Sequence, residues 1–272
     1  MLEWDGHWLR VGDQWFATVD PAVFLAGLHE EGSPQRMLTE QGIVPEAAQG
    51  SPHVLVWKSR SMIEQLARII DEIDPRTIVE LGIATGGSVA LLGALAPQAK
   101  VVAIEIDPVP APHLVNHIAH WDLAHRLHPH FGVDQANRDA LRTILADDLG
   151  DAPLDLVIDD ASHRLDLTRR SFEILYPRMR PGGCYIIEDW AWAHYDIADV
   201  IPEAAVPGGP PLTVLICELL MSLGTSNGPI DRLEVRDTVR VWRGEAELDR
   251  ESWTLAQSIR TSQPVVAPTA YA

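Results

Sequence analysis

Two kinds of hydrophobic pattern alternate along the chain from residue 55 to about residue 190. One is the 3.6-residue period of an amphipathic helix, and the other is a short apolar run typical of a buried strand. The patterns predict these elements in order: helix 62–73, strand 78–79, helix 88–92, strand 101–104, helix 112–123, strand 126–131, helix 137–145, strand 154–158, helix 165–176 and strand 184–187. Such alternation indicates an α/β fold with a parallel sheet and right-handed crossovers, which binds ligands at the carboxyl ends of its strands.

The two ends of the chain have other patterns. Aromatic runs around Gly12-Asp13 predict a small hairpin near the N-terminus. We interpret residues 1–54 as an N-terminal extension that forms a lid, makes a subunit contact or packs on the core. Residues 55–263 are expected to form one domain, and residues 264–272 a flexible tail.

Two features near the C-terminal side of the domain complete the pattern. Residues 232–236 and 239–243 predict a second hairpin that turns at Asp237-Thr238. Before it, residues 190–211 are rich in aromatic side chains and then in proline and glycine. This stretch is either a lid that carries sugar-binding aromatic rings or a long surface loop anchored on the core.

The amino-acid composition narrows the classes of molecule that this protein is expected to bind. The 272 residues include 21 Lys and Arg against 39 Asp and Glu, a net charge of −18, which argues against binding to nucleic acid or to anionic membranes. Two cysteines, Cys184 and Cys217, do not make a disulfide framework. The chain shows neither a signal peptide nor an apolar stretch of bilayer length. We therefore expect a cytoplasmic protein.

The sequence Thr-Ile-Val-Glu-Leu-Gly-Ile-Ala-Thr-Gly-Gly-Ser, residues 77–88, predicts a tight loop between a strand and a helix. Its Glu80 lies two residues before Gly82, where a carboxylate repels phosphate and attracts an ammonium group. A second acid, Glu105, ends the next strand 23 residues after Gly82, the position of a ribose-binding acid. Ammonium and ribose without phosphate describe S-adenosylmethionine. The alternative is a glycine turn that only packs helix on strand.

Two later strands end in acids. The strand before Asp159-Asp160 and the strand before Glu188-Asp189 are joined by a helix, so they should lie side by side and bring these carboxylates together. Hard oxygen ligands that repel one another suit Mg²⁺ or Ca²⁺, and we predict a metal site of Asp160, Glu188 and Asp189. Asp159 should point to the other side of its strand. The alternative is that these acids cap helices.

Four motifs together resemble the metal-dependent class I S-adenosylmethionine O-methyltransferases. The resemblance is strongest to the branch of the macrocin and mycinamicin sugar O-methyltransferases and the cephalosporin hydroxylase-like proteins, and it covers about residues 55–195. The motifs are Glu80-Leu-Gly-x-x-x-Gly86-Gly87-Ser88, Glu105, Asp160-Ala-Ser-His163 and Gly182-Gly183-x-x-x-x-Glu188-Asp189. The resemblance implies a Rossmann-like, seven-stranded, mostly parallel sheet with one antiparallel strand.

The resemblance also implies a role for each matching residue. It assigns Glu80, Gly82, Gly86 and Ser88 to the methionine side of the cofactor, Glu105 to the ribose, Asp134 and Gln135 to the adenine, Asp160, Glu188 and Asp189 to Mg²⁺, and His163 to the general base beside Asp160. The alternative is that His163 has no catalytic role and only caps the following helix.

We therefore expect a Mg²⁺-dependent methyl transfer from S-adenosylmethionine to a hydroxyl of a sugar or glycoside, either a natural-product deoxysugar or a mannose-type saccharide. The expected partners are this small molecule and further copies of the chain. Three alternatives stay open: a catechol-type O-methyltransferase, an oxidoreductase or hydroxylase accessory protein, and a binding protein without turnover. The missing G-x-G-x-x-G loop counts against a nicotinamide cofactor.

Overall fold

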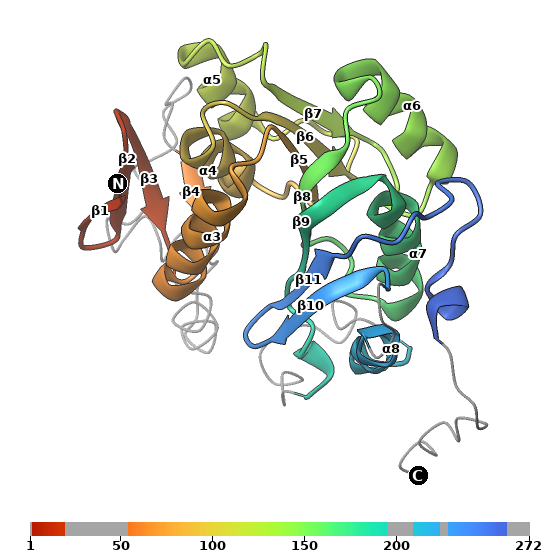
Figure 1. Ribbon diagram of the computed structural model, residues 1–272. Coiled ribbons are helices and arrows are strands. Elements are labelled where there is room, and N and C mark those ends of the chain that lie inside the picture. Colours follow the sequence, from red (N-terminus) through yellow and green to blue (C-terminus); the bar gives the residue numbers. More distant parts are fainter. Residues whose placement is uncertain (1, 20–53, 195–208, 224–227, 260–272) are drawn as a thin grey trace.

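A seven-stranded sheet forms the centre of the computed structural model, which describes residues 2–19, 54–194, 209–223 and 228–259 (Figure 1). Its strand order is β10-β11-β9-β8-β5-β6-β7, and β11 runs antiparallel to both of its neighbours. The strands are β5 (Thr77–Leu81), β6 (Lys100–Glu105), β7 (Leu127–Phe131), β8 (Leu154–Asp159), β9 (Met179–Ile187), β10 (Ile230–Val235) and β11 (Val239–Arg243). The predicted mostly parallel sheet and the C-terminal hairpin are confirmed.

Helices cover both faces of this sheet (Figure 1). They are α3 (Arg60–Ile73), α4 (Gly87–Leu95) and α5 (Pro112–His120) on one face, and α6 (Arg138–Leu149), α7 (Leu165–Leu175) and α8 (Thr213–Leu223) on the other. Neighbouring strand residues point to opposite faces, so Ile78 joins the core under α3 and α4 while Val79 joins the core under α6 and α7. Burial on both faces explains why these strands read as continuous apolar runs.

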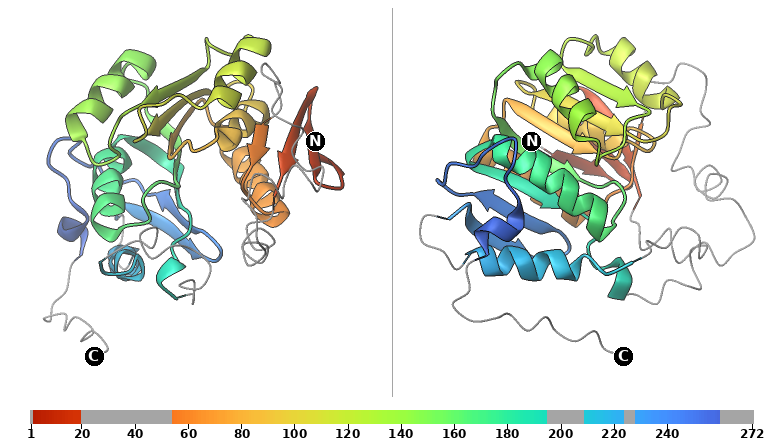
Figure 2. Two further views of the ribbon diagram at one scale, coloured as in Figure 1. Left: turned by 180° about the vertical axis from the view of Figure 1, so that it is seen from behind. Right: turned by 90° about the vertical axis from the view of Figure 1, so that its right-hand side faces the viewer.

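A smaller four-stranded sheet lies beside α3 and α4, away from α6 and α7 (Figure 2). Its strands are β1 (Leu2–Asp5), β2 (Trp8–Val11), β3 (Gln14–Thr18) and β4 (Val54–Val56), and the predicted hairpin turns at Gly12-Asp13 between β2 and β3. Strand β4 pairs parallel with β3. Phe16 and Val56 are fully buried in the same core cluster as α3 and α4, so these strands pack directly on the main domain.

Two turns differ from what the local sequence suggests. The acidic run at residues 147–151 has the composition of a turn, but α6 continues to Leu149, so that only Gly150 and Asp151 turn, and Asp148 lies between two histidines. Asp148 Oδ1 lies 2.7 Å from His128 Nδ1, and Asp148 Oδ2 lies 2.7 Å from His130 Nε2. Burial alone would raise the pKa of Asp148, but the two imidazoles outweigh it and hold the pKa below its ordinary value. The histidine pair therefore has a packing role.

The second difference concerns residues 180–183, whose sequence Arg-Pro-Gly-Gly has the composition of a turn before the strand predicted at 184–187. Strand β9 already begins at Met179, and its register with β8 shifts between Leu154 and Leu156 to accommodate the extra residues. A short 3₁₀ helix, Tyr176–Arg178, connects α7 to this strand. Two further 3₁₀ helices span Trp192–His194 and Leu255–Ser258.

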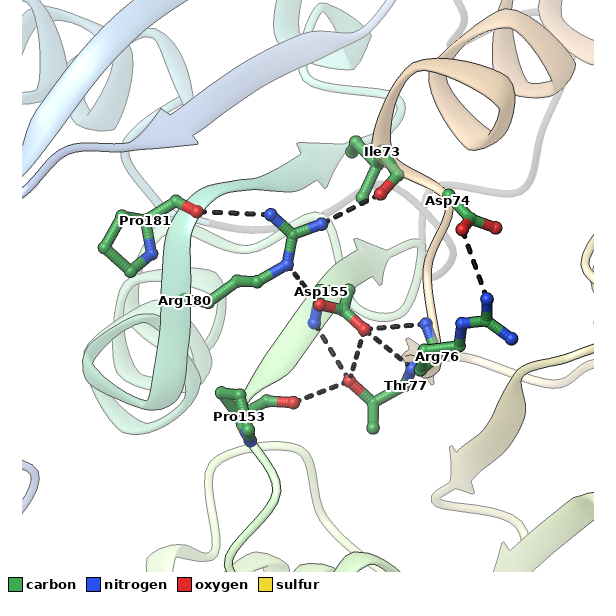
Figure 3. Close-up of polar contacts among 8 residues, drawn as sticks. All are labelled: Ile73, Asp74, Arg76, Thr77, Pro153, Asp155, Arg180 and Pro181. Atoms are coloured by element: carbon green, nitrogen blue, oxygen red, sulfur yellow. Dashed lines mark hydrogen bonds and ion pairs between the residues drawn. The ribbon is translucent and has the colours of Figure 1, made fainter.

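The amino-terminal edge of the sheet is held by a buried acid, Asp155 (Figure 3). Its Oδ2 accepts hydrogen bonds from the backbone N–H groups of Arg76 at 2.7 Å and Thr77 at 2.9 Å. Its Oδ1 pairs with Nε of Arg180, whose Nη2 also donates to the carbonyl of Ile73 at 2.9 Å. One carboxylate thus joins β5, β8, β9 and the end of α3 at the edge opposite the predicted ligand site.

Several predictions fall outside the described residues. These are the C-terminal tail at 264–272, residues 20–53 of the N-terminal extension and residues 195–208 of the aromatic and Pro/Gly stretch. In the part of the chain that the structure describes, none of the helices has the length and apolar character needed to span a bilayer.

Candidate active site

The loop after β5 is shaped by contacts with other parts of the protein. Gly82 and Gly86 have φ angles of +93° and +87°, which favour glycine. A Cβ at Gly82 would lie 2.2 Å from the carbonyl oxygen of Asp160, and one at Gly87 would lie 1.8 Å from that of Leu55. The sequence interpretation gave these glycines to ligand approach. The structure shows that packing against the β8–α7 loop and β4 already requires them.

Glu80 is a fully buried acid near the end of β5. The hydroxyl of Ser88 is buried beside it, but among the described residues neither side chain makes a hydrogen bond of normal geometry. Burial raises the pKa of Glu80 to about 7, although the Lys58 ammonium and the Ser88 hydroxyl oppose the shift. Buried polar groups are normally satisfied, so these two side chains have the chemistry to receive a cationic donor such as an ammonium group.

A cavity of about 470 Å³ opens beside this loop, at the carboxyl ends of β5, β6 and β8. Glu105, at the end of β6, lines it and accepts hydrogen bonds at Oε2 from the backbone N–H groups of Ile83 and Ala84, both at 2.9 Å. This carboxylate therefore braces the glycine loop. The residues that line the cavity are Gly82, Ala84, Ile104, Glu105, Ile106, Val133, Asp134, Gln135, Asp160, Ala161, Ser162 and Leu167.

Asp134 and Gln135 both contribute to the cavity wall, as their predicted position at this edge requires. Asp134 is exposed, and its Oδ1 accepts a hydrogen bond from the N–H of Ala136 at 2.8 Å. The Gln135 side chain is buried, donating to Asp159 at 3.2 Å and accepting from the N–H of Ser162 at 3.1 Å. Gln135 therefore joins the loops after β7 and β8 through its side chain.

Asp159 points away from Asp160, as the alternation along a strand predicts. It is 2% exposed and accepts hydrogen bonds from Ser171 Oγ at 2.6 Å and Tyr185 OH at 2.8 Å. Burial raises the pKa of Asp159, and these donors only partly offset the effect. Asp159 is thus part of the packing under α7.

Asp160, His163 and Asp189 form the one group in the described ranges whose ligand atoms could surround a metal ion, with all three atoms within 4.8 Å of one another. His163 Nε2 lies 3.9 Å from Asp189 Oδ2. Both residues have positive φ angles, 53° for His163 and 51° for Asp189, which are uncommon outside glycine and cluster at functional sites.

His163 is held from its other side by an aromatic ring. The Trp192 ring stacks on its imidazole with the centroids 5.3 Å apart and the planes at 12°. Helix α7 begins after an N-cap at Arg164 that makes no side-chain capping bond, so His163 does not cap this helix. The alternative role of His163, as a cap of the following helix, is therefore wrong.

Glu188, which the sequence placed among the metal ligands, has a different neighbour. Its Oε2 lies 2.5 Å from Nζ of Lys58, which also lies 2.9 Å from Asp160 Oδ2. The Lys58 side chain is 2% exposed. Burial disfavours its charged form, but the carboxylates of Asp160, Glu188 and Glu80 outweigh that effect and raise the pKa of Lys58 above its ordinary value.

Lys58 is a site residue absent from the predicted set, since charged side chains such as those of Lys58 and Arg60 are expected to face solvent. That expectation fits only Arg60, which is exposed, pairs with Glu64 at 2.8 Å and covers the ring of Trp4. The one local signal is that Lys58 stands between a buried strand and the N-cap Ser59 of α3.

Comparisons with known proteins agree with this geometry. A family model described as a methyltransferase domain matches residues 79–190. Demethylmacrocin O-methyltransferase of Streptomyces fradiae is 54% identical over 43 residues, which are 16% of this chain and 11% of that protein. A rhamnosyl tetracenomycin-C 3'-O-methyltransferase of Streptomyces olivaceus is 31% identical over 128 residues, 44% of this chain and 29% of that protein. The chain thus spans less than a third of either relative.

Solved structures share the fold. The MycE methyltransferase of mycinamycin biosynthesis, in complex with Mg, SAH and mycinamycin VI, superposes with a TM-score of 0.50 at 23% identity, covering 66% of this chain and 49% of that one. A Staphylococcus aureus protein described as a caffeoyl-CoA O-methyltransferase gives 0.52 at 15% identity, covering 82% and 98%. The resemblance seen in the motifs is confirmed at this level: residues 79–190 match a methyltransferase domain, and the chain shares the fold of these O-methyltransferase structures.

Proposed function

We propose that this chain transfers a methyl group from S-adenosylmethionine to a hydroxyl of a sugar or glycoside, with Mg²⁺ as a second cofactor. The observation that carries the proposal is the position of Asp160. This residue lines the cavity beside the glycine loop and also belongs to the Asp160–His163–Asp189 group. A methyl donor in the cavity and an acceptor hydroxyl at the acidic group would therefore be neighbours.

The residues around the cavity fit S-adenosylmethionine. Glu80 and Ser88 offer buried oxygens, which make no hydrogen bond of normal geometry within the described segments, to the amino group of the cofactor. Glu105 stands at the position for the ribose, and Asp134 and Gln135 on the wall assigned to the adenine. The match to a methyltransferase domain supports this assignment, as does the presence of SAH in the MycE complex.

Asp160, Glu188 and Asp189 would hold the Mg²⁺ ion. Lys58 contacts Oδ2 of Asp160 and Oε2 of Glu188, and no contact to Oδ1 or Oε1 is seen among the described residues, so each acid keeps an oxygen for a cation. When bound, Mg²⁺ supplies a positive charge that lowers the pKa of a hydroxyl beside it. The MycE complex contains Mg as well.

His163 is the proposed general base. Its Nε2 would take the proton of the acceptor hydroxyl as the methyl group moves, because imidazole is the side chain that most often serves as a general base. The stacked Trp192 ring fixes the plane of the imidazole, and Asp189 stabilises the imidazolium that results. The protein thus orients the base before the acceptor arrives.

The sugar class of acceptor comes from the relatives. Those described above are named as O-methyltransferases of demethylmacrocin and of a rhamnosyl tetracenomycin, and the second name includes a sugar. The free cysteines, Cys184 buried and Cys217 exposed, fit the cytoplasmic location that we propose. Assembly of two or more copies stays a prediction, which light scattering can test.

The experiment that tests the function has two stages. Thermal unfolding is measured with S-adenosylhomocysteine, with Mg²⁺ and with both, against NADH and EDTA controls. A ligand at 100 times its Kd should stabilise the protein by about 2.7 kcal/mol. Methyl transfer is then assayed on glycosides and on a catechol. Stabilisation by NADH alone would contradict the cofactor, and transfer to the catechol alone would contradict the acceptor.

A further inference from the structure

Lys58 reaches the acidic site from outside the methyltransferase domain match. It lies between β4 of the small N-terminal sheet and α3, and its two carboxylate partners follow it by 102 and 130 residues in the chain. Strand β4 also contacts the cofactor loop, since Leu55 O accepts a hydrogen bond from Thr85 Oγ1 at 3.4 Å. The small sheet therefore supplies this lysine and one wall of the glycine loop.

The charges around Lys58 do not balance. Glu80 and Glu188 are 0% and 5% exposed, and Asp160 is partly buried, so three carboxylates surround a single buried ammonium. Carboxylates at such short range repel one another unless protons or cations compensate them. Lys58 supplies one positive charge, and protons on these acids or a bound divalent cation would supply the rest.

We propose that Lys58 is an internal counter-cation of this site, which holds Asp160 and Glu188 together while no metal is bound and which weakens the binding of Mg²⁺ through its own charge. The inference deepens the proposed function and rests on its metal site. Lys58 is then a positioning residue, because it acts through the two carboxylates.

The physical reason is that the lysine and the metal use the same carboxylates. Lys58 lies 2.9 Å from Asp160 Oδ2 and 2.5 Å from Glu188 Oε2, so a cation on these acids would sit within a few ångströms of the ammonium. Like charges at this range repel strongly in a buried site. Removing the lysine charge should destabilise the metal-free protein and strengthen the binding of Mg²⁺.

The test uses the full chain dialysed against EDTA, with the variants Lys58→Met and Lys58→Gln and the control Arg60→Met. Urea unfolding of the metal-free proteins and calorimetric titration with Mg²⁺ are measured. We expect both neutral Lys58 variants to have a lower urea midpoint without metal and to bind Mg²⁺ at least tenfold tighter, about 1.4 kcal/mol. Added Mg²⁺ should restore their midpoints, and the control should match the wild type.

Three results would overturn the inference. Unchanged or weaker Mg²⁺ binding by a folded Lys58 variant would show that the lysine charge does not oppose the metal. Failure of both neutral variants to fold even in saturating Mg²⁺ would show that the metal cannot replace the lysine. Absence of Mg²⁺ binding by the wild-type protein would instead contradict the metal site of the proposed function. The titration of the wild-type protein therefore separates this outcome from the other two.

Discussion

Asp155 offers a quantitative test of how the sheet is held at the edge away from the site. The change Asp155→Ala removes the acceptor of two backbone N–H groups, Arg76 and Thr77, and of the Arg180 guanidinium. An unsatisfied buried donor costs about 1–3 kcal/mol. The Arg180 side chain is 35% exposed, so its lost ion pair adds only about 1 kcal/mol after solvent screening.

The expected loss in the free energy of unfolding is therefore about 3–7 kcal/mol, measured by urea denaturation at pH 7. The matched control is Asp74→Asn, which removes the charge of the exposed Arg76–Asp74 pair at 3.3 Å, tolerates the left-handed backbone at this position and should cost less than about 0.5 kcal/mol. Affinity for S-adenosylhomocysteine should stay unchanged in both variants, because the cavity lies at the opposite edge of the sheet. A loss below about 1 kcal/mol for Asp155→Ala would refute the account of the network in Figure 3.

Three further predictions concern the site and the acidic helix end. His163→Ala should lower kcat about 10² to 10⁴-fold, the range for losing a general base, while Mg²⁺ affinity by calorimetry changes less than about threefold; a tenfold loss of Mg²⁺ affinity would show that His163 is a metal ligand instead. Gly82→Ala should weaken S-adenosylhomocysteine binding at least tenfold in a calorimetric titration, because its Cβ would lie 2.2 Å from Asp160 O; unchanged binding would contradict the shape given for the loop. Asp148 has a lowered pKa, so its contribution to stability is complete above the ordinary carboxyl pKa of about 4 and is lost as the pH falls through the lower folded pKa; Asp148→Asn should remove this part of the acid dependence in urea titrations from pH 7 to pH 3, and an identical profile would argue against it.

The sequence by itself determined the elements and their order. Alternating helical and strand periods predict the parallel sheet, because each period reflects which faces of an element are buried. The hairpin at Asp237-Thr238 and the loop at Gly82 were also visible as local signals. Chain topology then places strand ends at one edge, so the proximity of Asp160 and Asp189 followed from the pattern as well.

Only the tertiary structure decided how the acids of the site are divided. Glu188 and Asp189 are neighbours in the chain, yet Glu188 contacts Lys58 and Asp189 joins Asp160 and His163. That difference depends on the left-handed backbone at Asp189 and His163 and on the packing of β4 against the main domain. Hydrophobic periods encode buried faces but not side-chain partners, so the local sequence around Lys58 does not show that it pairs with acids more than a hundred residues away.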